Sequence, residues 1–166
     1  VPMVIFDPRL PKEKRGRVAE EMVLNVDLPA TFIAWAGAPR PDAYEGRSLS
    51  TIVDGDGSDK PWRTHFFCEH LDLPPTLTWE GIRDSRYVYA RYFDQQPAFE
   101  FLHDLEQDRD ELKNFANDPA HADALKKMRE LCNIEMNARG GALPPLGQRG
   151  AQKGEGAPKK KKKANK

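Results

Sequence analysis

The sequence predicts an α/β protein in which the end of a larger sheet is followed by a small four-stranded antiparallel sheet and a C-terminal helix. Three observations support this fold class. The chain opens on an apolar run, Val1–Phe6, typical of a strand that is covered on both faces. From Trp62 the residues alternate as half-buried strands do, and after Asp118 an amphipathic helical pattern begins.

The charge is distributed unevenly along the chain. The 166 residues have a formal net charge of zero, yet residues 139–166 hold nine Lys or Arg and one acid, Glu155. Residues 1–138 are therefore acidic, which disfavours a nucleic-acid-binding body. The sequence contains no apolar run of roughly 20 residues, so a membrane-spanning helix is not expected.

Residues 1–50 are predicted to form the end of an α/β core domain. After the first strand comes a charged loop, then a short strand over Met22–Leu24. A helix over residues 28–36 follows, with Asn25 or Asp27 as its N-cap and Gly37 at its end. Together these elements are expected to be an edge piece of an α/β sandwich.

Residues 51–61 are rich in turn formers and are predicted to be a connecting loop. Residues 62–137 then predict a subdomain with strands near 63–71 and 99–108 and a hairpin over 80–93, whose turn is Asp84–Arg86. Its helix has Asp118 as a cap and Pro119 at its first position. The apolar stripe of this helix is Ala124, Leu125, Met128, Leu131 and Cys132. Residues 138–166 have too few apolar side chains to fold and are predicted to be disordered.

The two cysteines, Cys68 and Cys132, have neither zinc-site nor thioredoxin-like spacing. Two interpretations stay open for them: one disulfide, or two buried free thiols.

Five segments in order resemble the C-terminal part of type I, formylglycine-dependent sulfatases. They are "VPMVIFDPRLPKEKRGR", "LNVDLPATFIAWAGAPRPDAYEGRSL", "WRTHFFCEH", "GIRDSRYVYARYF" and "FLHDLEQDRDELKNFANDP". The resemblance covers residues 1–135 and is strongest to the bacterial branch that acts on sulfated sugars. It implies the C-terminal part of an alkaline-phosphatase-like fold and a periplasmic or extracellular protein.

The resemblance also implies a reaction, hydrolysis of a sulfate ester by a formylglycine nucleophile with the help of Ca²⁺. That nucleophile is made from a C/S-x-P-x-R motif, and neither cysteine nor any serine of this sequence lies in one. We therefore assign no catalytic or metal-binding residue to this chain. Formylglycine and Ca²⁺ are expected in the parent enzyme, of which this chain would be a C-terminal fragment.

In such a sulfatase the small subdomain borders the substrate cleft. The candidate substrate-binding residues are Glu69 and His70, at the end of a strand, and Arg83 and Arg86, around the hairpin turn. A histidine beside a glutamate can hydrogen-bond a sugar hydroxyl, and an arginine can bind sulfate with two donors. The alternative is a surface Arg–Glu pair and a histidine satisfied by its neighbours.

Four aromatic residues near the hairpin also allow two interpretations. Tyr87, Tyr89, Tyr92 and Phe93 form either a sugar-stacking surface or, as is more usual under a helix, the core.

The expected partners are the remainder of the sulfatase core and a sulfated carbohydrate or small sulfate ester. Lys159–Lys163 can contact a polyanion by counterion release, although such a run is usually only a solvated tail. The alternative function is a non-catalytic binding module with a basic tail.

Overall fold

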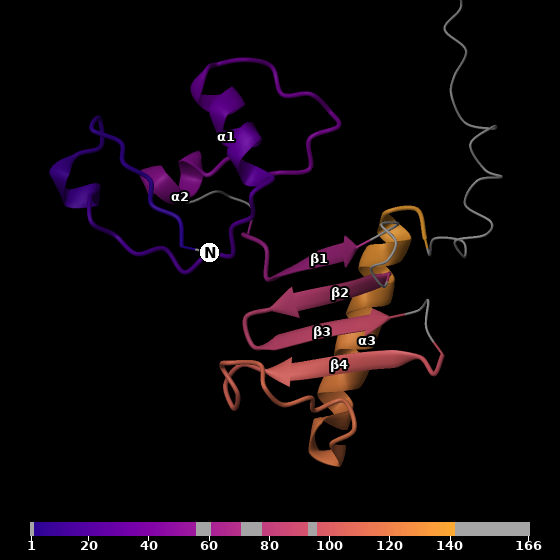
Figure 1. Ribbon diagram of the computed structural model, residues 1–166. Helices are drawn as coiled ribbons and strands as arrows, with labels where there is room; N and C mark the ends of the chain where they lie inside the picture. The colour runs from indigo at the N-terminus through magenta and orange to yellow at the C-terminus, as the bar shows by residue number, and fades with distance from the viewer. Residues whose placement is uncertain (1, 56–60, 71–77, 93–95, 142–166) are drawn as a thin grey trace, which may run out of the picture. The chain divides into compact units, whose positions relative to one another are not determined.

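The computed structural model describes residues 2–55, 61–70, 78–92 and 96–141, and the chain divides into two compact units, Val1–His65 and Phe66–Lys166 (Figure 1). Unit 1 contains a 3₁₀ turn, η1 (Lys12–Lys14), and two helices, α1 (Asp27–Trp35) and α2 (Ser50–Asp54). Unit 2 contains the four strands of the sheet, of which β1 begins at the unit boundary. They are β1 (His65–His70), β2 (Trp79–Asp84), β3 (Tyr87–Tyr92) and β4 (Phe99–Asp104). A 3₁₀ turn, η2 (Pro119–His121), and the long helix α3 (Ala122–Ala138) complete it.

The two helices of unit 1 are joined through a buried hydroxyl group. Thr31 of α1 donates a hydrogen bond of 2.7 Å to the backbone oxygen of Asp27. The same hydroxyl oxygen accepts the amide of Leu49, just before α2, at 2.9 Å. Thr31 and Leu49 are both fully buried, so this bond is shielded from water.

Asp27 is the polar centre of unit 1. Its carboxylate is fully buried and accepts the amides of Leu24 at 2.7 Å and Arg47 at 2.8 Å. Both terminal nitrogens of Arg63 donate to it at 2.6 Å. Both expected N-caps of α1, Asn25 and Asp27, are therefore wrong. Val26 is at the N-cap position, Asp27 is the first helical residue, and the Asp27 carboxylate accepts hydrogen bonds from outside the helix.

The strands expected at Val1–Phe6 and Met22–Leu24 are not formed. Val1 lies outside the described residues, and Pro2–Phe6 and Met22–Leu24 have no strand assignment. An apolar extended segment becomes a strand only when a neighbour completes its hydrogen-bond ladder. No strand pairs with them among the residues described in unit 1, and Val4 and Phe6 remain 91% and 82% exposed.

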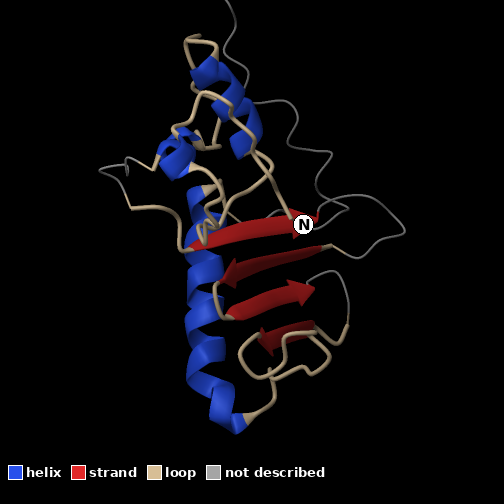
Figure 2. Cartoon of the chain, turned by 90° about the vertical axis from the view of Figure 1, so that its left-hand side faces the viewer, coloured by secondary structure: helices blue, strands red, loops and turns tan. Residues whose placement is uncertain are grey.

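The sheet of unit 2 confirms the predicted four-stranded antiparallel sheet. Its strand order is β1-β2-β3-β4, and neighbouring strands run in opposite directions (Figure 1). β2 and β3 form the expected hairpin, with Ile82 opposite Tyr89 and Tyr89 opposite Leu102 of β4. Helix α3 lies along one face of the sheet (Figure 2).

The core of unit 2 lies between the sheet and α3. Leu125, Met128 and Cys132 are buried, and Ala124 and Leu131 pack against them, which confirms the predicted stripe. The helix entry is also confirmed, because the Asp118 carboxylate accepts the Ala120 amide at 3.0 Å ahead of η2. The strands contribute Ile82, Tyr89 and Leu102 to this core, and the segment before η2 contributes Phe115.

The outer edge of β4 is closed by a side chain. Asn114 accepts the Leu102 amide at 3.0 Å and donates to the Glu100 carbonyl at 3.0 Å. The Phe115 amide adds a bond of 2.8 Å to the Leu102 carbonyl. Asn114 and Phe115 thus form hydrogen bonds with β4 backbone groups that could otherwise pair with a further strand.

Candidate functional site

The four candidate residues lie at opposite ends of the sheet. β1 ends at His70, so Glu69 and His70 lie where β2 and β4 begin. Arg83 is near the end of β2, and Arg86 is in the β2–β3 turn, at the other end. A strand of six residues is about 17 Å long. The structure therefore forms two separate polar groups from these candidates.

Arg86 is held by two carboxylates. Its Nε and Nη2 donate to the two oxygens of Asp104 at 3.1 and 2.8 Å, and Nη1 lies 2.9 Å from Glu106. Asp104 is fully buried, while the Arg86 side chain is 39% exposed. Hydrogen bonds from Arg86 lower the pKa of Asp104 to about 2. This paired carboxylate stays ionised and fixes the arginine beside the turn.

Asp104 also connects β4 to the start of α3. Gln107 donates to it at 3.0 Å, and His121 Nε2 lies 3.3 Å from the same carboxylate. The His121 ring packs on Phe115 with centroids 4.4 Å apart. These contacts join the turn, the loop after β4 and η2 into one partly buried polar network centred on Asp104.

Arg83 makes a more exposed ion pair. Its Nη1 lies 3.2 Å from Glu111, and the two side chains are 41% and 37% exposed. Glu111 has a φ of 55°, the left-handed region that non-glycine residues rarely adopt. The loop after β4 thereby reaches Arg83 on β2. An exposed pair of this kind contributes little stability, so Arg83 can exchange Glu111 for another anion.

Aromatic side chains gather at the end of the sheet that carries Glu69 and His70. Trp79 pairs with Tyr92, and Tyr92 pairs with Phe99, in one row across β2, β3 and β4. The ring centroids of Tyr92 and Phe99 are 5.7 Å apart, and those of Tyr92 and Phe101 are 6.3 Å apart. Phe99 is 47% exposed.

The structure separates the aromatic residues that the sequence left undecided. Tyr89 is 1% exposed and belongs to the core, and Tyr87 packs against the core. Tyr92 lies three residues beyond Tyr89 and so is on the opposite face. Phe93 lies outside the described residues. The sequence analysis did not identify Trp79, Phe99 and Phe101. Each lies an odd number of residues from Ile82 or Leu102 on its strand, and this spacing alone predicts that it lies on the face opposite the core.

Both cysteines are free thiols, so the disulfide interpretation is not adopted in this structure. Burial raises the pKa of Cys132 to about 12, and burial also raises the pKa of Cys68. Both side chains therefore stay protonated at neutral pH, which is the unreactive form.

The sequence does not fit a formylglycine, and the described residues do not fit a metal ion. The sequence has no C/S-x-P-x-R motif. Within residues 2–55, 61–70, 78–92 and 96–141, no group of three His, Cys, Asp or Glu side chains is placed to hold a metal. We derive no catalytic step from this chain.

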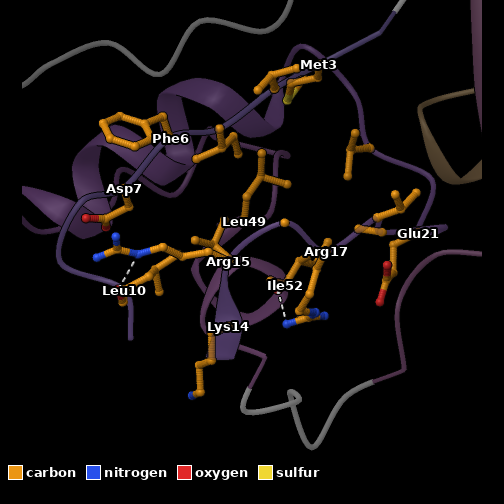
Figure 3. Close-up of a pocket in the computed structure, with 17 residues that line it drawn as sticks. Met3, Phe6, Asp7, Leu10, Lys14, Arg15, Arg17, Glu21, Leu49 and Ile52 are labelled. Atoms are coloured by element: carbon orange, nitrogen blue, oxygen red, sulfur yellow. Dashed lines mark hydrogen bonds between the residues drawn. The ribbon is translucent and has the colours of Figure 1, made fainter. Parts of the chain in front are cut away.

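Unit 1 carries an open apolar pocket of about 540 Å³ (Figure 3). Met3 and Phe6 line it from the first segment, and Leu49 and Ile52 line it from the region of α2. Arg15 lies at this pocket, but its Nε donates to the Leu10 carbonyl at 2.7 Å. The lining is therefore mainly apolar surface that the described part of unit 1 leaves accessible to solvent.

Solved structures that resemble this chain include sulfatases and a phosphonate monoester hydrolase. Residues 1–137 match the family model described as "N-sulphoglucosamine sulphohydrolase, C-terminal". The chain belongs to this family of sulfatase C-terminal domains, and its fold is the C-terminal part of the alkaline-phosphatase-like sulfatase fold. In the described part of the chain, no helix has the length and apolar character needed to cross a bilayer.

The similarity extends to individual bacterial enzymes. An arylsulfatase of Clostridium perfringens is 27% identical over 140 residues, which are 84% of this chain and 28% of that protein. An N-acetylglucosamine-6-O-sulfatase of Bacteroides thetaiotaomicron is 25% identical over 139 residues, which are 81% of this chain and 24% of that protein.

A solved structure of a 2-O GAG sulfatase superposes with a TM-score of 0.58 and 28% identity, over 68% of this chain and 24% of that one. The chain thus spans about a quarter of the length of these relatives.

Proposed function

We propose that this chain acts as the C-terminal portion of a sulfatase that hydrolyses a sulfated carbohydrate or a small sulfate ester. The observation that carries the proposal is the family match over residues 1–137, combined with a sheet and helix of the same architecture. The names of two relatives, an arylsulfatase and an N-acetylglucosamine-6-O-sulfatase, support the two substrate classes.

In this proposal the chain supplies structure and one wall of the substrate cleft. The nucleophile and its Ca²⁺ belong to other parts of the enzyme, the remainder of the sulfatase core. Glu69 and His70 are the residues we assign to the cleft wall, because both lie at a strand end and Glu69 is exposed. Arg83 and Arg86 remain candidates for binding an anionic group. Arg83 would first have to release Glu111, and Arg86 would have to release one of its two carboxylate partners, Asp104 and Glu106.

Two further parts of the proposal concern the surroundings of the enzyme. The family resemblance supports a periplasmic or extracellular location. Lys159–Lys163 lie outside the described residues, and we propose that their charge holds the enzyme near a polyanionic substrate.

The test begins with the coding sequence upstream of the Val1 codon. We expect the open frame to continue and to encode a C/S-x-P-x-R motif. The whole encoded protein should then release sulfate from N-acetylglucosamine 6-sulfate or an aryl sulfate, and a calcium chelator should stop the reaction. A frame that encodes no such motif, or a protein inactive on both substrate classes, would leave the binding-module alternative in place.

A further inference from the structure

The strongest unexplained feature is the aromatic row on the sheet face opposite α3. We propose that Trp79, Tyr92 and Phe99 form a stacking surface for a sugar ring of the carbohydrate. This inference rests on the proposed function, because it names how one part of that substrate is recognised. The proposed surface of this chain would contact the sugar ring and not the sulfate group.

The register places these side chains on one face. Ile82, Tyr89 and Leu102 point into the core beneath α3. Side chains alternate between faces along a strand, so a residue three positions away lies on the other side. Trp79 is three before Ile82, Tyr92 is three after Tyr89, and Phe99 is three before Leu102. The three aromatic residues are also mutual partners in the ladder.

The same end of the sheet carries hydrogen-bonding groups. Phe67 of β1 packs against the core, so His70, three residues on, shares the face of Trp79 and Tyr92. β1 ends at His70 where β2 begins at Trp79, and these strands are neighbours. Glu69 is exposed beside it. Small-molecule sites combine apolar and aromatic side chains with a few polar groups, and this end of the sheet has the same combination of residue types.

The three rings of the row are partly exposed to solvent in this chain. Phe99 is 47% exposed and Trp79 and Tyr92 are partly exposed, whereas Tyr89 on the core face is 1% exposed. The C–H groups on one face of a pyranose ring form an apolar surface. Covering that surface with an aromatic ring removes apolar area from water and leaves the sugar hydroxyls at the rim free to hydrogen-bond.

An uncharged probe tests the proposal without interference from the basic tail. We would titrate the full chain with the trisaccharide of β-linked N-acetylglucosamine and follow the aromatic side-chain signals by NMR. We expect shifts at Trp79, Tyr92 and Phe99 that persist at high salt. Phe99→Ala should weaken binding about threefold to tenfold, and Phe99→Trp should restore it.

Ile134→Ala is the matched control, because Ile134 is 62% exposed on α3, away from the row. It should leave the affinity unchanged. Signals of the core residue Leu102 should be the same in every variant, which separates lost binding from lost folding. The proposal is overturned if no shift occurs, if the shifts fall on other residues, or if Phe99→Ala binds as well as the parent chain.

The binding assay requires no hydrolysis, so its outcome is independent of sulfatase activity. A chain that binds the sugar but belongs to a protein that releases no sulfate would overturn the proposed function alone. In an active enzyme, Phe99→Ala should lower kcat/KM for a sulfated oligosaccharide. The same substitution should leave kcat/KM for a small aryl sulfate unchanged. Equal losses on both substrates would overturn the stacking role and leave the sulfatase assignment standing.

Discussion

At the scale of single residues, the Asp27 carboxylate joins three segments of unit 1, those of Leu24, Arg47 and Arg63. It is fully buried and accepts four hydrogen bonds, two of them from Arg63. We expect Asp27→Asn to lower the free energy of unfolding by about 3 kcal/mol, because Arg63 would be left without its partner charge. Urea titration measures the change. Asp110→Asn, at an exposed loop position, is the control, and an equal effect of both substitutions would contradict this role.

The second residue-scale prediction concerns acid. The pKa of Asp104 falls from 3.8 to about 2 in the folded chain because Arg86 donates two hydrogen bonds to it. A depressed folded pKa means that the carboxylate stabilises the fold above about pH 4 and loses this effect as the pH falls toward 2. The contribution is about 1 to 2 kcal/mol, since Arg86 is partly exposed.

Urea unfolding of the parent chain and Asp104→Asn between pH 2 and pH 7 measures this contribution. The variant should be less stable at neutral pH, and its stability should change less on acidification. Parallel pH profiles for the two proteins would show that Asp104 is not responsible.

Only part of the candidate site could be predicted from the sequence. Glu69 and His70 were identifiable, because a polar pair at the end of an apolar strand is visible in the sequence. Their separation from Arg83 and Arg86 depends on strand direction and on where each strand begins, which is set by tertiary pairing. For Phe99 the sequence predicts only membership of a strand, because the face on which its side chain lies depends on the register with Tyr92.

At the scale of elements, the strand edge of β4 depends on Asn114. We expect Asn114→Ala to lower stability by about 1 to 3 kcal/mol, because the Leu102 amide and the Glu100 carbonyl lose their partner. The opened edge should also increase concentration-dependent association. Urea titration and light scattering measure the two effects. Asn133→Ala, on the exposed side of α3, should match the parent chain in both measurements. An equal rise in association above the parent chain in the two variants would contradict the edge-closing role.

Elements whose partners are near in sequence were predicted well. The β2–β3 hairpin and the stripe of α3 follow from local periodicity, and the Asp118 cap follows from local turn chemistry. The strands expected at Val1–Phe6 and Met22–Leu24 failed because a strand requires a pairing partner that periodicity does not reveal. α1 was located well, yet its apolar residues Phe32 and Trp35 remain 59% and 40% exposed.

At the scale of the whole molecule, the two units differ in how their apolar surface is covered. Unit 2 encloses its core between sheet and helix, whereas unit 1 exposes Val4, Phe6 and Phe32 and carries the open apolar pocket. Exposed apolar surface of this extent favours association. We therefore expect the 166-residue chain to form oligomers whose size grows with concentration.

Val4→Asp combined with Phe6→Ser should shift these oligomers toward monomers, because it places a charge and a hydroxyl on the exposed segment. Leu112→Ser is the control, since Leu112 is 85% exposed in unit 2 and lies outside the pocket. Size-exclusion chromatography with light scattering, at several concentrations, measures the distribution. A parent chain that stays monomeric throughout, or a control that dissociates the oligomers equally, would show that the apolar surface of unit 1 does not drive association.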